Sequence, residues 1–306
     1  MTIVVPESAS PSRTRVALCV AAVIACIPYA VLKIAWIAGS DLGTEDAEAA
    51  ELMHETSTVI ANVMTLGLEL GAVAIVAGLT FVRRIPPFLL VGPIWVGTGL
   101  LAPVAVGLPI GLVAQGIAGG APAPDDGGLH GWVFALVYGG FIIQTPLLVG
   151  AFALHVTHRW PWVFRLRGRD ITPGSTYALQ LLMARTALVV TALLAVVSIL
   201  WAIDAEAFAG PSGFETVAQR TFVLTGGVLP LAGALGAHAL VRRRREGPLL
   251  RPLAATWVGS ATAFATVALP SAGQTGFESF VSAVSGMTGV ALAITGLLVL
   301  IDAQRR

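Results

Sequence analysis

The sequence has few charged residues for its length. Of its 306 residues only 11% are Asp, Glu, Lys or Arg, while 56% are hydrophobic and the mean hydropathy is +0.84. A soluble domain carries about a quarter charged residues. The composition therefore excludes an ordinary soluble protein and predicts a protein embedded in a lipid bilayer.

Several residue types with characteristic chemistry are scarce. The chain has one lysine, Lys33, one asparagine, Asn62, and two cysteines, Cys19 and Cys26. The cysteines lie two turns apart on one predicted helix and cannot bridge each other, and no Cys/His cluster suggests a metal, so we expect neither metal nor cofactor. The motifs GxxxxGK[ST], HExxH and GxSxG are absent, as is the NxxxDxxxD motif of intramembrane aromatic prenyltransferases. These absences exclude P-loop ATPases and the commonest intramembrane proteases, and nothing indicates a nucleic-acid partner.

Long apolar runs divide the chain into about eight candidate spans, each near the ~20 residues that a bilayer requires. They lie at about 16–39, 56–82, 88–113, 131–155, 178–203, 217–240, 252–270 and 277–301. The fold class predicted is all-α, a polytopic helical bundle over 15–306 after a disordered segment over 1–14. The first run is too long for a signal-peptide core, so we expect it to be retained as a helix. The third contains Pro93, Pro103 and Pro109 and could be one kinked helix or a broken one.

The charged residues alternate between the connections. Arginine-rich connections hold Arg13 and Arg15, Arg83 and Arg84, Arg159 to Arg169, Arg242 to Arg251, and Arg305 and Arg306. The other connections hold the acids, at Asp41 to Glu55, Asp125 and Asp126, and Asp204 to Glu215. Because basic loops stay in the cytoplasm, both termini are expected there, in a multi-pass protein of the plasma (cytoplasmic) membrane.

The chain also shows signs of internal duplication. Glu55-Thr56, Thr65, Gly67, Ala72 and Arg83 recur at a fixed offset as Glu215-Thr216, Thr225, Gly227, Ala232 and Arg243. Trp95-Val-Gly-Thr98 likewise recurs as Trp257-Val-Gly-Ser260. The pattern favours two four-helix half-repeats, 15–160 and 178–306, in the same orientation.

The second run carries an acid, Glu69, at its middle. A carboxylate at bilayer depth costs about 3 kcal/mol, so such residues are usually functional. The stripe that leads to it along one helix face consists of Glu51, Glu55, Thr58, Asn62, Thr65 and Glu69. The aligned position of the other half is Leu229, so the acid belongs to one half alone. The structural alternative is a neutral carboxyl group hydrogen-bonded to a neighbouring helix.

The first run has its own polar stripe, at Cys26, Tyr29, Lys33, Trp36 and Ser40. In one interpretation the Lys33 ammonium reaches the membrane surface and Trp36 belongs to the aromatic belt. In the other, this face packs on the second helix, so that Lys33 meets Glu69, Asn62 or an acid of the following loop. Asn62 itself is as consistent with a link between helices as with a ligand group.

Further candidate site residues are Trp95, Trp132, Tyr138 and Gln144. The aromatic residues could line an apolar pocket, although Trp132 also suits the membrane interface, and a buried Gln144 more often joins helices. The acidic loop over 43–56 could bind a divalent cation, but its alanine-rich spacing is more typical of a solvated helical extension.

Three classes of function remain. An intramembrane enzyme could use Glu69 as a general acid that protonates an alkene or epoxide, while aromatic faces stabilise the carbocation and an apolar wall excludes water. A proton- or cation-coupled transporter or channel would use the same acid and stripe. A non-catalytic membrane subunit would need no site.

The residues Pro28-Tyr29, Lys33, Trp36, Gly39 and Glu69 give the chain a resemblance to a known family. In these residues and in size and span number it resembles the small bacterial integral-membrane terpene cyclases of meroterpenoid pathways. The resemblance implies cyclisation of a lipophilic prenyl substrate supplied by an upstream prenyltransferase. The analogous fungal cyclases are described with two intramembrane carboxylates, whereas this chain has one, which leaves the second role to Asp41 or another loop acid.

Overall fold

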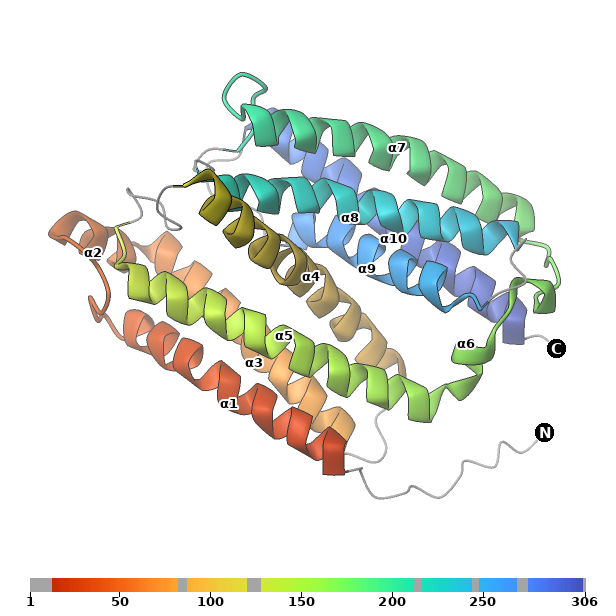
Figure 1. Cartoon of the computed structure of the whole chain (residues 1–306), viewed down its shortest axis with the longest axis horizontal. Coiled ribbons are helices and arrows are strands. Elements are labelled where there is room, and N and C mark those ends of the chain that lie inside the picture. The colour runs from red at the N-terminus through yellow and green to blue at the C-terminus, as the bar shows by residue number, and fades with distance from the viewer. Residues whose placement is uncertain are drawn as a thin grey trace. The chain divides into compact units, whose positions relative to one another are not determined.

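The computed structural model describes residues 13–81, 87–119, 128–211, 216–243, 248–268 and 275–304. Within these ranges the chain is helical, apart from its connections and two isolated β-bridges (Figure 1). The α-helices are α1 (Arg13–Ile37), α2 (Ala47–His54), α3 (Thr56–Phe81), α4 (Pro87–Ala118), α5 (Gly131–Arg159), α6 (Pro161–Arg165), α7 (Tyr177–Ile203), α8 (Val217–Arg242), α9 (Leu250–Ala268) and α10 (Gly276–Gln304), with a short 3₁₀ helix η1 (Gly168–Asp170).

The predicted all-α polytopic membrane fold is confirmed. Seven helices of the described ranges are long and apolar enough to cross a bilayer, namely α1, α3, α4, α5, α7, α8 and α10. The seventh expected span, 252–270, forms α9, a helix of 19 residues that is not among those seven. The third span is one continuous helix of 32 residues despite its prolines, because membrane helices tolerate proline where neighbouring groups satisfy the freed carbonyls.

Three sequence-based expectations concern segments that lie partly or wholly outside the described residues. The disordered start was expected over 1–14, but α1 already begins at Arg13, and the residues before it lie outside the description. The acidic connection at Asp125 and Asp126 and the basic pair Arg83-Arg84 also lie outside the described ranges.

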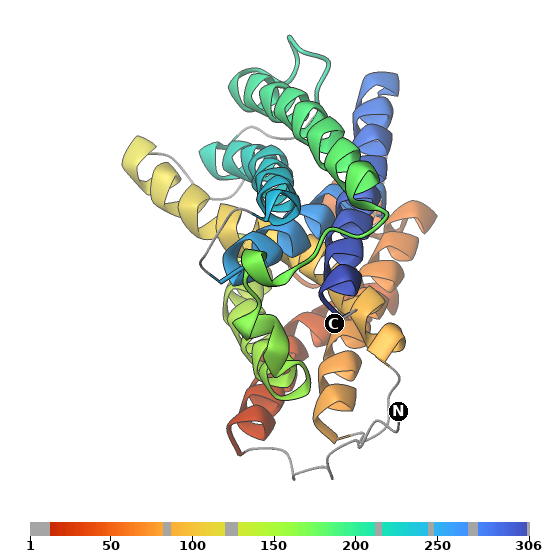
Figure 2. The same ribbon diagram turned by 90° about the vertical axis from the view of Figure 1, so that its right-hand side faces the viewer.

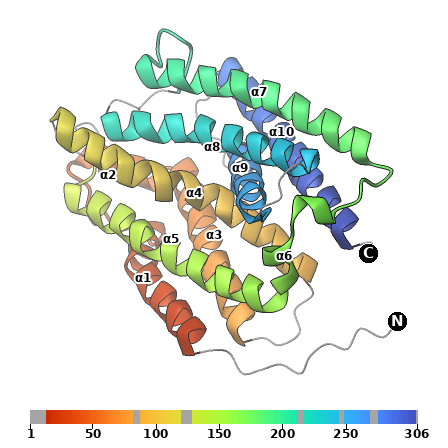
Figure 3. The same cartoon turned by 45° about the vertical axis from the view of Figure 1, so that its right-hand side comes forward.

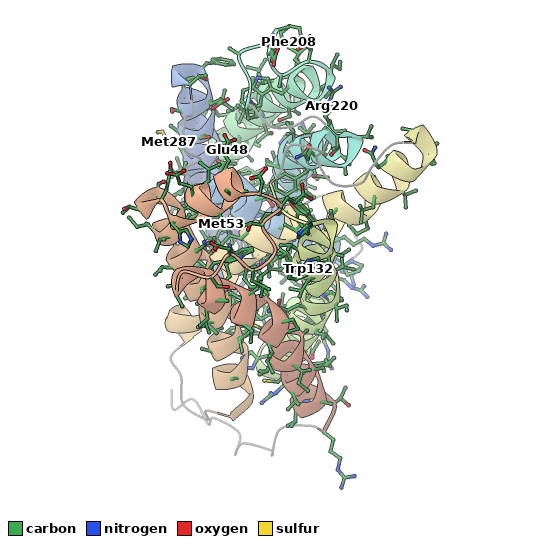
Figure 4. The ribbon with its side chains drawn as sticks, turned by 90° about the vertical axis from the view of Figure 1, so that its left-hand side faces the viewer. Glu48, Met53, Trp132, Phe208, Arg220 and Met287 are labelled. Carbon is green, nitrogen blue, oxygen red and sulfur yellow. The ribbon has the colours of Figure 1, made fainter. Side chains whose placement is uncertain are left out.

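Contacts divide the chain into two compact units. The first unit comprises Met1–Ile94 and Gly128–Arg159, and holds α1, α2, α3 and α5. In it α1 packs against both α3 and α5, and α3 also contacts α5. One end is closed by an apolar cluster on which Met53 of α2 packs; Met53 and Trp132 of α5 are marked in Figure 4.

The second unit comprises Trp95–Gly127 and Trp160–Arg306, with most of α4 and all of α6 to α10. Helix α8 packs against α7 and α9, and α10 packs against α9, α7 and α8. Figure 2 views this unit from the end where α10 finishes. Helices α8 and α9 approach closely at Gly233 and Gly259, where a Cβ atom on either glycine would collide with the facing backbone. Small residues at such crossings let membrane helices pack by van der Waals contact.

Helix α4 packs in the same unit along α8 and α9. A Cβ atom on Gly99 would strike the Ala261 carbonyl of α9, and one on Gly111 would lie 2.9 Å from the Ala218 backbone of α8. Two side-chain bonds reinforce the crossing with α9. Trp95 Nε1 donates to Ser260 Oγ at 2.9 Å, and Trp257 Nε1 donates to Thr98 Oγ1 at 3.2 Å. The two copies of the repeated Trp-Val-Gly-Ser/Thr motif therefore bind each other reciprocally.

Candidate functional site

The polar stripes of α1 and α3 face each other inside the first unit. The helices run antiparallel, so residue numbers increase along the α1 stripe in the direction in which they decrease along the α3 stripe. The stripes meet as three successive pairs, Lys33 with Asn62, Tyr29 with Thr65, and Cys26 with Glu69. The members are three and four residues apart on each helix, which is the spacing of one helix face. We call this set the polar ladder.

The first pair of the ladder holds the single lysine. The Lys33 ammonium donates a 2.6 Å hydrogen bond to Asn62 Oδ1 and lies 5.0 Å from the Trp36 ring centre and 5.5 Å from that of Tyr29. Aromatic faces attract a cation by about 0.5–2 kcal/mol, depending on its desolvation. Of the partners that the sequence allowed, the lysine therefore takes Asn62, and the described residues contain no ion pair between Lys33 and Glu69.

The second and third pairs lead to the acid. The Tyr29 hydroxyl lies close enough to the Thr65 side chain to interact with it, and Thr65 Oγ1 donates to the Ala61 carbonyl at 2.9 Å. Deeper along α3, the Cys26 thiol lies close enough to the Glu69 carboxyl group to interact with it electrostatically. Glu69 lies thirteen residues after the first residue of α3, or about 20 Å along its axis at 1.5 Å per residue.

Glu69 is buried but only partly satisfied. Its exposed fraction is 7%, and Oε1 has no hydrogen-bond partner. An unsatisfied buried polar atom is costly, and each such atom in a native structure calls for an explanation in a ligand, a water or a catalytic role. The free carboxyl oxygen can therefore bind or protonate a group that enters the unit.

Helix α5 packs against both α1 and α3 beside the polar ladder. Its Phe141 ring packs on Tyr29 with centroids 5.2 Å apart. Gln144 lies one turn further on the same face and is 1% exposed, with an unpartnered Nε2. Because α5 is antiparallel to α1, the Tyr29–Phe141 contact places Gln144 at the depth of Cys26 and hence of Glu69. An amide donor and a carboxyl oxygen, both without partners, thus occur at one level of the unit.

A polar cap covers the end of the unit where the ladder begins. His54 Nε2 lies 2.7 Å from Asp41 Oδ1, and His130 Nδ1 lies 3.7 Å from Glu45 Oε1. Trp36 Nε1 donates to the Leu42 carbonyl at 2.8 Å and so anchors the cap to α1. The acidic loop forms the separate helix α2, whose first turn is capped by Asp46. Within the described ranges no three His, Cys, Asp or Glu residues are grouped to hold a metal ion.

The other predicted site residues lie elsewhere. Trp132 is 45% exposed and Tyr138 41% exposed, with the Tyr138 ring stacked on Phe134 on the surface of α5. Trp95 belongs to the second unit, where it is bound to Ser260. The structure therefore brings Tyr29, Lys33, Trp36, Asn62, Thr65 and Glu69 together on α1 and α3, with Gln144 at the same depth on α5.

Three residues that border the site were not predicted as site residues from the sequence. Cys26 was assigned to the α1 stripe but not to the site, although it contacts Glu69 directly. Phe141 packs on Tyr29, and Thr145 is a buried hydroxyl with no partner. The identical three-and-four spacing of the two stripes was the available signal for Cys26. Phe141 and Thr145 follow Tyr138 at the same three-and-four spacing on one helix face, which was the available signal for these two α5 residues.

Comparison with protein families, with curated proteins and with solved structures yields no match.

Proposed function

We propose that this membrane protein is an enzyme that starts the cyclisation of a lipophilic prenyl or terpenoid substrate by proton transfer from Glu69. The observation that carries the proposal is the buried Glu69 carboxyl group, whose Oε1 has no partner while the ladder connects its surroundings to one end of the unit. A proton donor held in an apolar environment away from water suits the protonation of a carbon–carbon double bond.

The proposed reaction is an isomerisation. The Glu69 proton adds to one alkene carbon, and the π electrons form the new C–H bond. The resulting carbocation is attacked by the next double bond, which closes a ring. The last cation loses a proton to water, so substrate and product have the same composition. Glu69 regains its proton from the outer face by way of the ladder.

The walls of the site suit such a substrate. The aromatic pair Tyr29 and Phe141 lies next to the Cys26–Glu69 level, where its rings can stabilise a cation. The faces of Trp36 and Tyr29 near Lys33 already hold the ammonium group, so Phe141 is the first candidate for the carbocation. Gln144 Nε2 can orient a polar group of the substrate. A substrate of this class enters from the plasma (cytoplasmic) membrane after a prenyltransferase has made it.

Proton-coupled transport is the second candidate. The polar ladder favours it, because a row of facing polar side chains ending at an acid is also what proton coupling uses. On α3 the same face continues beyond Glu69 as Ala72 and Val76, which have no polar group. A transported proton would therefore need a different path to the other membrane face.

The test is to incubate membranes that contain the protein with a panel of linear prenylated aromatic compounds and free polyprenols, and to analyse the products by mass spectrometry. We expect a product of unchanged mass and altered retention that membranes without the protein do not form. In parallel, the purified protein in liposomes is assayed for proton uptake with a pH-sensitive dye. Cyclised product without proton flux supports the enzyme. Glu69-dependent proton flux without product supports the transporter and contradicts our proposal.

A further inference from the structure

One end of the second unit carries exposed arginines that the proposed proton chemistry does not use. This end is formed by the segment over 160–176, the beginnings of α7 and α9, and the ends of α8 and α10; Figure 3 shows α6 beside α9. Four of its exposed arginines, which we call the arginine face, are Arg165, Arg167, Arg242 and Arg251.

Backbone contacts hold these arginines on a common surface. The Leu249 amide donates to the Leu166 carbonyl at 2.9 Å, and Arg167 forms a β-bridge with Pro248. The side chains of Leu166 and Leu249 are buried in one apolar cluster with residues of α7, α8 and α10. The segment that follows α6 is therefore attached to the connection between α8 and α9.

Aromatic residues border the arginine face. Trp160 precedes α6, whose first residue is Pro161, and Trp162 packs against the buried cluster. Tryptophan concentrates at the level of the lipid headgroups, where an apolar ring and a polar N–H group are both accommodated. The short helix α6 thus places Arg165 and its neighbours where headgroups would lie.

The positive charge of this surface is not cancelled by the described carboxylates. Asp302, on the last turns of α10, is buried and accepts hydrogen bonds from Arg243 at 2.8 Å and from Gln180 at 2.9 Å. The side chains of Asp170 and Glu246 lie outside the description. The described side chains of this end include no exposed acid beside the four exposed arginines.

We propose that the arginine face binds the headgroups of anionic phospholipids such as phosphatidylglycerol. Guanidinium groups match phosphate oxygens with two parallel hydrogen bonds. Basic residues next to membrane helices attract the anionic lipids of the cytoplasmic leaflet. A soluble polyanion could also bind to arginines, but the adjoining tryptophans are typical of the membrane interface and not of a surface that faces bulk water. The proposal does not depend on the reaction at Glu69.

The experiment titrates the detergent-purified full-length protein with phosphatidylglycerol or phosphatidylcholine and counts bound lipids by native mass spectrometry. We expect phosphatidylglycerol to bind at least about tenfold more tightly. Each arginine near a membrane surface contributes about fivefold to such attraction. The variant R165Q/R167Q/R242Q/R251Q is therefore expected to bind phosphatidylglycerol about a hundredfold or more weakly.

Two further variants keep the test decisive. Arg220 is exposed at the opposite end of α8 from Arg242 and is marked in Figure 4, so R220Q is the matched control and should bind as the wild type does. The fourfold Arg-to-Lys variant retains the charge if the glutamine variant fails to fold, and should keep most of the selectivity. Equal binding of the two lipids by the wild type, unchanged affinity in the folded glutamine variant, or tighter binding of an RNA oligonucleotide than of phosphatidylglycerol would overturn the proposal.

Discussion

Lys33 donates a 2.6 Å hydrogen bond to Asn62, which joins the single lysine of the chain to its single asparagine across α1 and α3. The same ammonium group lies against the rings of Tyr29 and Trp36. The pair begins the ladder that ends at Glu69, so its removal tests how far the ladder holds the first unit together.

Removal of one partner of this pair should destabilise the protein. In N62L the Lys33 ammonium loses its acceptor, at a cost of about 2 kcal/mol in the free energy of unfolding. The double variant K33M/N62L replaces both polar groups by apolar ones and should recover most of that loss. Both losses in the free energy of unfolding are measured by monitoring the unfolding of the purified protein in detergent with circular dichroism. Equal losses in the single and double variants would show that the bond contributes nothing.

The crossing of α4 and α9 depends on a glycine. The substitution G99A places a Cβ atom against the Ala261 carbonyl, where no flexible side chain can yield. We expect a loss of about 2 kcal/mol or more, comparable to overpacking of a tight core. Gly97 lies two residues earlier on α4, and a Cβ atom there meets nothing within 4 Å. G97A is the matched control and should be neutral or slightly stabilising, because alanine favours helices. If G99A lost less free energy of unfolding than G97A, the close contact between Gly99 and α9 would be contradicted.

Because the two tryptophan hydrogen bonds are reciprocal, the loss of either one should lower the free energy of unfolding by a similar amount. The substitutions S260A and T98V each leave one indole N–H without an acceptor, Trp95 in the first and Trp257 in the second. An unsatisfied donor costs about 1–2 kcal/mol, so both variants should lose stability by similar amounts. The exposed Ser175 provides S175A as a control with no expected loss. If T98V and S260A unfold like S175A, the pairing does not stabilise the unit.

The buried ion pair of the second unit should be sensitive to the loss of one charge. The Asp302 and Arg243 side chains are only 3% and 6% exposed and lie 2.8 Å apart. D302N leaves a buried guanidinium without its counter-charge, which costs about 3–5 kcal/mol. The double variant R243M/D302L should be more stable than D302N, since no charge remains to be compensated. A D302N protein as stable as the wild type would refute this assignment.

Hydropathy and charge predicted much of the fold. The second and fourth spans, expected at 56–82 and 131–155, correspond to α3 (Thr56–Phe81) and α5 (Gly131–Arg159). Both are continuous apolar runs between polar connections, so their ends are visible in the sequence. Helix α9 was counted as a span, but its polar residues leave it outside the seven apolar helices. The continuity of α4 could not be foreseen, because proline does not by itself decide between a kink and a break.

The candidate site was predictable only in part. The shared face of Asn62, Thr65 and Glu69 follows from helical spacing, whereas the partner of Lys33 depends on the register between α1 and α3. Tyr138 illustrates the limit, since an aromatic residue inside a span can face lipid as well as a site, and here it is exposed. Arg243 was assigned to a basic connection, but it ends α8 and is buried against Asp302. That contact joins residues 59 positions apart, and no local pattern reveals it.

The central claim is that Glu69 donates the proton that starts cyclisation. Its most direct test is the initial rate of product formation by wild-type and E69Q protein on the linear prenylated substrate that the membrane assay identifies. The glutamine side chain has the same shape but cannot donate an acidic proton. E278Q is the matched control, because Glu278 is a buried glutamate at the start of α10 in the second unit. We predict a rate lowered at least about a hundredfold in E69Q, the lower end of what a general acid contributes, with helical content unchanged and E278Q as active as the wild type. A folded E69Q protein that cyclises the substrate at the wild-type rate would contradict the account.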